Sequence, residues 1–247
     1  SPQGRPVIVQ AGGSPGGIAL GAVHADVIFA VAQTVDRAVA FRTELRQRAL
    51  AEGRDPDQLL VSLGVVVIVG DTEEEALRRA DELFDTGDVV SASAGFVAQL
   101  GLDPERFGPD DAISIDDLPA VATGVGPEGF LLSTRALLAE QPLTPRELIR
   151  RSGGGGGHRT VIGTPEQIAD DLEAWHRAGA ADGFTLMPAD IAVDFEAVTS
   201  RVIPILQQRG LVQREYAGHT LRETLGLDPV PPRGVQTAPS APAQAGA

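Results

Sequence analysis

Cysteine is absent from the 247 residues, which excludes disulfide bonds, thiolate metal sites and a cysteine nucleophile. Runs of basic residues are also lacking, and the formal net charge is −14, so neither nucleic acid nor an anionic membrane surface is expected as a partner. No apolar stretch approaches the length of a membrane span, and no signal peptide is visible. These absences make the cytoplasm the expected location.

Methionine occurs once, at Met187, so the chain does not open on an initiator. Its first residues, Ser1 to Pro6, have the composition of a loop that leads into a strand. We therefore expect either a processed N-terminus or the C-terminal part of a longer protein.

Apolar residues make up 43% of the chain, enough for a substantial core. Short apolar, β-branched segments alternate with segments of helical periodicity that begin after Ser14, Thr34, Thr72 and Thr164. This alternation predicts an α/β fold with a parallel sheet. The strands are expected at 7–10, 27–31, 59–69 and 183–187, whereas Val161 to Gln167 is interpreted as the start of a helix. A last helix, from Phe195 to Gly210, carries Pro204, which predicts a kink or an early stop.

The alternation stops between residues 86 and 158. This segment has helix candidates at 91–100, 130–139 and 145–151, and an Asp- and Pro-rich stretch at 103–117. We interpret it as an insertion, because no set of strands is evident in it, and insertions of this length often cover a site. Residues 1–227 are thus expected to form the folded part. The Pro- and Ala-rich residues 228–247 are expected to be a disordered tail.

About four parallel strands do not close a barrel. They correspond to half of an eight-stranded TIM barrel, and this count agrees with the missing initiator. The expected fold is therefore a TIM-barrel type of α/β fold, present as a C-terminal half-barrel with a helical insertion.

A glycine-rich turn, Gln10 to Gly17, joins the first strand to the first helix. Ser14 suits the N-cap and Pro15 the first helical position, and such a helix start can bind a phosphate. A plain turn built from small residues is the alternative. The spacing of glycines fits neither a dinucleotide fingerprint nor a P-loop, since Ser14 and Ile18 stand where those motifs need glycine and lysine.

Ser152 is followed by five glycines and then by His158. A flexible linker is the favoured interpretation of this run, and a mobile segment near a ligand is the alternative. His158 is a candidate substrate contact, whereas His24 and His176 are expected to be structural. No two histidines have metal-ligand spacing, so no metal site is predicted, and no catalytic residue is assigned.

Six segments together carry a resemblance to one family. They are Gly4–Ser14, His24–Asp26, Gly163–Asp170, Gly179–Phe184, Leu206–Leu211 and Tyr216–Arg222. In this order they resemble the C-terminal half of luciferase-like flavin monooxygenases, in the group of nitrilotriacetate monooxygenase and dibenzothiophene-sulfone monooxygenase. The resemblance runs from about residue 4 to residue 227 and is weakest in the insertion.

The resemblance implies a two-component monooxygenase of TIM-barrel type. Such an enzyme takes reduced FMN from a separate flavin reductase and uses O2 to oxygenate a small organic substrate. Ala11, Gly12, Gly13 and Ser14 match the family's flavin-phosphate turn, with Ser14 as the side-chain contact. The insertion would border the active site, and the full-length protein would be a homo-oligomer.

The chain departs from the family in one large respect: the strands that carry most isoalloxazine contacts are not in it. A catalytically inactive fragment with residual flavin-phosphate binding is therefore the alternative function. An open half-barrel edge would also favour pairing with another chain. A deazaflavin-dependent oxidoreductase is a third possibility, against which the segments Gln208 to Leu211 and Tyr216 to Arg222 argue.

Overall fold

The computed structural model describes residues 2–85, 88–120, 126, 128–154 and 156–230. They belong to two compact units. Residues 8–214 contain the sheet, its helices and the insertion, and residues 2–7 with 215–230 belong to the other unit. In the latter, helix α10 (Leu221–Thr224) is capped by Thr220. Residues 231–247 of the expected tail lie outside the described residues.

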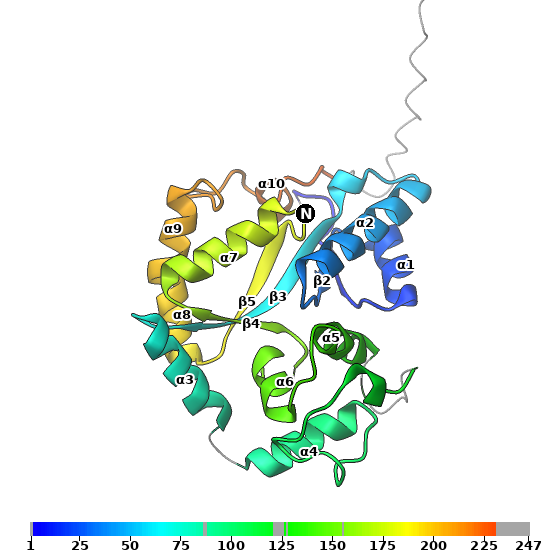
Figure 1. Cartoon of the computed structure of the whole chain (residues 1–247). Coiled ribbons are helices and arrows are strands. Elements are labelled where there is room, and N and C mark those ends of the chain that lie inside the picture. Colours follow the sequence, from blue (N-terminus) through cyan, green and yellow to red (C-terminus); the bar gives the residue numbers. More distant parts are fainter. Residues whose placement is uncertain (1, 86–87, 121–125, 127, 155, 231–247) are drawn as a thin grey trace, which may run out of the picture. The chain divides into compact units, whose positions relative to one another are not determined.

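Five parallel strands form one open sheet in the described chain (Figure 1). They are β1 (Val9–Ala11), β2 (Val27–Ala30), β3 (Leu60–Val69), β4 (Arg159–Gly163) and β5 (Gly183–Pro188). The predicted parallel α/β sheet is therefore confirmed, and it contains one strand, β4, beyond the about four that were expected. β4 was not expected because it is only five residues long and runs straight into the strong helix start at Thr164.

The register of the sheet places two strands along a single edge of β3. β2 pairs with residues 60–63 of β3, and β4 pairs with residues 65–69. β5 pairs with residues 62–67, and since a strand has two edges, β2 and β4 share the edge opposite β5. Gly64 lies at the level where β2 ends and β4 begins, so the residues around this junction come from distant parts of the chain.

The helices begin where the capping residues predict. Ser14, Thr34 and Thr164 each accept a backbone N–H in the first turn of the helix that follows. The helices of the larger unit are α1 (Pro15–His24), α2 (Val35–Ala51), α3 (Glu73–Asp85), α4 (Val89–Gln99), α5 (Glu128–Leu138), α6 (Pro145–Arg151), α7 (Pro165–Arg177), α8 (Ile191–Ala197) and α9 (Ile203–Gln208).

The last helical segment of this unit continues past Pro204, so the early stop considered for it does not occur. Helices α8 and α9 are joined by a π-helical turn, Val198–Val202, and Pro204 lies in the first turn of α9. Proline is tolerated at this position because it lacks the N–H that, in the first turn of a helix, would have no intrahelical acceptor.

The core lies between one face of the sheet and its helices. Ile28, Val61 and Leu63 pack with α1 and α2, and Val65 and Val67 pack with α7 and the segment that contains α9. The other face is less covered: Val9 is 62% exposed. The Ser62 Oγ–Thr185 Oγ1 hydrogen bond (2.9 Å) is also exposed. Toward the carboxyl end of β3 both faces are covered, since Val66 and Ile68 on one face and Val65 and Val67 on the other are all buried.

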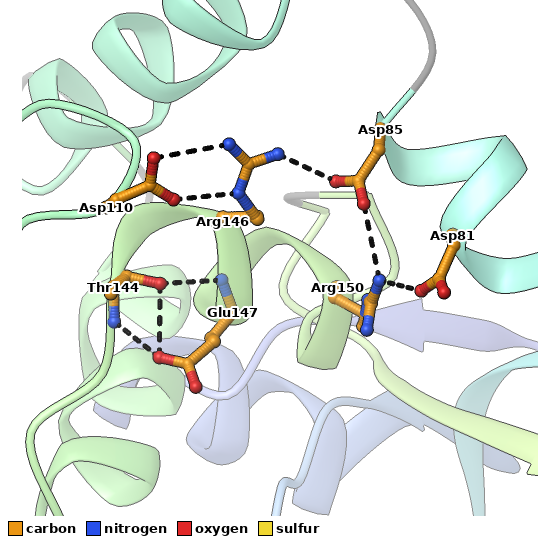
Figure 2. A network of polar contacts seen from close by, with 7 residues as sticks. All are labelled: Asp81, Asp85, Asp110, Thr144, Arg146, Glu147 and Arg150. Atoms are coloured by element: carbon orange, nitrogen blue, oxygen red, sulfur yellow. Dashed lines mark hydrogen bonds and ion pairs between the residues drawn. The ribbon is translucent and has the colours of Figure 1, made fainter. Parts of the chain in front are cut away.

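The insertion has a hydrophobic core of its own, contributed by α4, α5, α6 and the loops between them. Figure 1 shows these three helices grouped together. An ion-pair network ties α6 to α3 and to the Asp-rich loop (Figure 2). Arg146 contacts Asp85 (3.0 Å) and Asp110 (2.9 Å), and Arg150 contacts Asp81 and Asp85. Single exposed pairs contribute little, but several charges in one network contribute more to holding α6 against α3 and the Asp-rich loop.

Candidate functional site

A cavity of about 620 Å³ opens at the carboxyl ends of β1 and β2. Its wall combines the glycine turn after β1, the segment from β2 to α2, helix α5 of the insertion, and the glycine run before β4. The carboxyl ends of parallel strands are where α/β folds place their ligands, because the loops that follow the strands converge there.

The glycine turn has a defined geometry. Ser14 caps α1, its Oγ accepting the N–H of Gly17 at 3.2 Å. Gly12 has φ +144°, which favours glycine, and a Cβ on Gly17 would lie 3.1 Å from the Gly12 carbonyl oxygen. Gly13 and Gly16 differ, because a Cβ on either would meet no atom within 4 Å. The Gly16 amide also has no acceptor within the helix, as the second residue of α1. The turn therefore presents an open backbone surface with a free donor.

The second wall comes from β2 and the start of α2. Phe29 is in β2, and Gln33, Arg37 and Phe41 follow at intervals of four residues. Residues four apart lie on one face of a helix, so Arg37 and Phe41 turn the same side of α2 toward the cavity. This wall is aromatic, with one amide and one guanidinium.

The insertion supplies the third wall. Phe130, Leu132 and Ser133 of α5 line the cavity, as does Gln99 of α4. The ring of Phe130 packs edge-on against Phe96, with 5.1 Å between centroids. The insertion thus borders the same cavity as the glycine turn, which is how an insertion can shape what enters it.

The described glycines of the 152–157 run form a turn held in place by hydrogen bonds, which argues against the flexible linker favoured from the sequence. Gly153, Gly154 and Gly157 have φ of +61°, +72° and +83°, a region that glycine adopts most readily. The Gly157 carbonyl accepts hydrogen bonds from Gln33 Nε2 (2.8 Å) and Ser133 Oγ (3.0 Å). The run therefore joins the β2–α2 loop to α5.

His158 lies at the junction of β2 and β4. Its ring is 5.4 Å from that of Phe29, centroid to centroid. A Cβ at residue 64 would overlap the imidazole, so the glycine there makes room for it. The Nδ1 atom is buried and has no hydrogen-bond partner among the described residues. Burial lowers the pKa of His158 below its ordinary value, partly opposed by the backbone of Gly64. The ring is therefore kept neutral near pH 7.

All five site residues expected from the sequence line this cavity: Ala11, Gly12, Gly13, Ser14 and His158. His176, expected to be structural, has its Nδ1 3.0 Å from the Ala181 carbonyl oxygen, outside the cavity. The sequence did not single out Phe29, Gln33, Arg37 or Ser133. Phe29 and Arg37 could have been considered from their positions in and after a predicted strand, because residues that follow adjacent parallel strands meet at the same edge of the sheet.

In the described part of the chain, no three or more His, Asp or Glu side chains are grouped so as to hold a metal ion. None of the helices formed by the described residues is both long enough and apolar enough to cross a bilayer.

Comparison with known proteins supplies the family. Residues 1–182 match the sequence profile of the luciferase-like monooxygenases. The chain is 36% identical to N-acetyl-S-(2-succino)cysteine monooxygenase of Bacillus subtilis (strain 168), covering 92% of this chain and 51% of that protein. It is also 36% identical to nitrilotriacetate monooxygenase component A of Aminobacter aminovorans, covering 92% of this chain and 49% of that protein.

A solved structure, riboflavin lyase RcaE with modified FMN and riboflavin, superposes with a TM-score of 0.69. It is 27% identical, covering 93% of this chain and 49% of that one. The chain thus spans about half the length of the curated relatives it matches. The extent of the profile match and the identity across nearly the whole chain confirm the resemblance drawn from the six sequence segments: this chain belongs to the luciferase-like monooxygenase family.

Proposed function

We propose that this chain forms part of a two-component flavin-dependent monooxygenase. In this proposal it contributes the phosphate side of an FMN site and one wall of the substrate cavity. Reduced FMN comes from a separate flavin reductase, and O2 is used to oxygenate a small organic substrate. Family membership supports the reaction class, and the printed name "component A" of one relative supports a separate partner component.

The glycine turn carries the proposal. Gly13 and Gly16 have ordinary backbone angles and open space where a Cβ would be, so neither conformation nor packing requires glycine at either position. A ligand that lies against the backbone does require it. The Ser14 hydroxyl, free to donate its own hydrogen, and the Gly16 amide would hold the phosphate at the positive end of α1, with Ala11 and Gly12 shaping the turn.

The remaining walls fit a planar, mostly apolar ring system. Phe29, Phe41 and Phe130 offer aromatic surfaces, and the neutral His158 adds a polar atom without a buried charge. When bound, reduced FMN supplies the electrons and the reaction with oxygen. The residues of this chain position the flavin and substrate and keep water away from them.

Substrate choice is assigned to the insertion, since α5 and the glycine run border the cavity. The names of the relatives specify different substrates, N-acetyl-S-(2-succino)cysteine and nitrilotriacetate, so we propose only a small organic compound here. The chain spans about half the length of its relatives. We therefore propose that the rest of the flavin site, and any homo-oligomer, require the remaining half of the full-length protein.

Titration of FMN into the 247-residue chain, followed by flavin fluorescence, tests the proposal. Gly13→Ala should weaken FMN binding at least about tenfold while leaving stability within about 0.5 kcal/mol. Ser14→Ala should weaken binding and also remove a helix cap, at about 1 kcal/mol. Thr164→Ala removes an equivalent cap from α7 and is the matched control, expected to lose stability but not FMN affinity.

The outcomes separate the alternatives. No FMN binding by the wild-type chain, or equal binding by the wild type and Gly13→Ala, would support the inactive fragment instead. A deazaflavin titrated in parallel tests the third possibility, and tighter binding of that compound than of FMN would favour it.

A further inference from the structure

Arg37 is the only charged side chain among the described residues that line the cavity, apart from the titratable His158. None of the described residues that line it is Asp or Glu, although the chain has 34 acidic residues against 20 basic ones. All 20 basic residues of the chain are arginine, so finding arginine rather than lysine at this position carries no information by itself. In a strongly acidic chain, the described wall of this cavity thus contains a cation and no anion.

The guanidinium of Arg37 has no counter-ion in the described structure. Arginines outside the cavity are commonly paired: Arg42 lies 2.6 Å from Asp182, and Arg159 lies 2.6 Å from Asp171. Arg37 is an exposed residue, as is the unpaired Arg214, and it makes neither an ion pair nor a side-chain hydrogen bond with any residue the structure describes. Asp36 is its neighbour in the first turn of α2 but does not line the cavity. All donors of the Arg37 guanidinium are therefore available to a ligand.

The position of Arg37 is set by the fold. It lies in the first turn of α2, which starts at the N-cap Thr34, and Phe41 one turn later lines the same cavity. The partial positive charge at a helix start adds to that of the guanidinium in attracting an anion. A guanidinium binds carboxylate or phosphate oxygens through two parallel N–H bonds, a geometry that lysine cannot provide.

We propose that Arg37 binds an oxyanion of the ligand that occupies the cavity. This proposal rests on the proposed function, in which the cavity takes flavin and substrate. The shared chemistry is a carboxylate or phosphate group, and it has two sources: the phosphate of FMN or a carboxylate on the organic substrate. In either case Arg37 sets the charge that the site accepts, and an uncharged ligand gains nothing from it.

Binding of four probes to the 247-residue chain at low ionic strength tests the inference by calorimetry. The probes are FMN, riboflavin, succinate and inorganic phosphate. Arg37→Gln removes the charge, and Arg37→Lys keeps it without the paired N–H geometry. Arg214→Gln is the matched control, because Arg214 is exposed, makes no ion pair with a described residue and does not line the cavity.

Arg37→Gln should weaken an anionic probe at least about tenfold, since a hydrogen bond to a charged group contributes that much, and Arg37→Lys should fall between it and the wild type. A loss for FMN and phosphate but not riboflavin identifies the flavin phosphate as the source. A loss for succinate with FMN unchanged identifies a substrate carboxylate.

The inference is overturned if Arg37→Gln binds every anionic probe as tightly as Arg214→Gln does, or if the wild-type chain binds none of them. Failure of the flavin proposal looks different: the wild-type chain would bind neither FMN nor riboflavin, while the succinate and phosphate arms would still report on Arg37.

Discussion

The imidazole of His158 and the phenyl ring of Phe29 lie 5.4 Å apart, centroid to centroid, with an angle of 36° between their planes. Phe29 belongs to β2, and His158 immediately precedes β4, the strand that continues along the same edge of β3. The contact therefore closes the junction between two strands that do not pair with each other. It also places a neutral ring in the wall of the cavity.

His158 should make the folded chain less stable as the pH falls below 6.5. Its pKa in the folded chain is below the ordinary value of 6.5 because burial disfavours the charged ring. The unfolded chain therefore takes up the proton first as the pH falls. The stabilising effect is fully present above pH 6.5 and is lost as the pH falls below it toward the folded value.

Urea unfolding of the wild type and His158→Phe between pH 8 and pH 5 measures this effect. The variant keeps a ring against Phe29 but has no titrating group at this position. As the pH falls, the wild type should therefore lose more unfolding free energy than the variant. Parallel pH profiles would show that the ring is not buried in its neutral form.

Gly64→Ala should destabilise the chain, because the new methyl group would overlap the His158 ring and lie 3.0 Å from Phe29 Cε2. Overpacking of this kind costs about 1 to 3 kcal/mol. Gly183→Ala, on the neighbouring strand β5, has no atom within 4 Å of the added Cβ and should stay within about 0.5 kcal/mol of the wild type. Chemical denaturation of the three proteins checks the difference, and equal stabilities would contradict the packing at residue 64.

The Gly157 carbonyl should couple Gln33 to Ser133. Each donates a hydrogen bond to this one oxygen, so each alanine substitution should cost about 1 kcal/mol. The double variant leaves the carbonyl without either donor. Its cost should exceed the sum of the single costs by about 0.5 kcal/mol or more, measured in a double-mutant cycle. Strict additivity would mean that the oxygen finds another donor, such as water in the cavity.

Arg79 should be far more important for stability than its neighbour Arg78. Arg79 lies 2.7 Å from Asp194, whose side chain is fully buried, and Asp194 also accepts the backbone N–H of Val69 at the end of β3. Removing one partner of a buried pair costs about 3 to 5 kcal/mol, so Arg79→Met should lose this much in urea unfolding. Arg78 pairs with Glu82 in the open, and Arg78→Met should lose less than about 1 kcal/mol. Similar losses for both would show that Asp194 is hydrated.

Local patterns predicted most of the larger unit. The caps at Ser14, Thr34 and Thr164 fall where the structure has them, because N-capping depends on residues within one turn of each other. The helix candidates of the insertion, at 91–100, 130–139 and 145–151, overlap α4, α5 and α6. Strand β4 was missed, because a five-residue strand is stabilised mainly by its pairing with β3, and nothing in its own residues outweighs the helix signal that follows.

The candidate site likewise contains some residues that the sequence could identify and others that it could not. The glycine turn and His158 could be named as separate candidates because small residues around an N-cap, and a histidine after a glycine run, are visible along the chain. Arg37 was not named, since an arginine near a helix start is ordinary until the cavity beside it is known. The flexible linker was favoured for the glycine run because the two donors that hold Gly157 come from residues far from it in sequence.

The amino-acid sequence by itself determined the parallel α/β class, the helix starts and the family, all of which depend on residue types and short spacings. Only the tertiary structure decided that the glycine turn, Arg37 and His158 line one cavity. That convergence depends on register: β2 and β4 meet along one edge of β3 at Gly64, and no local pattern specifies which distant strand pairs with which half of a long one.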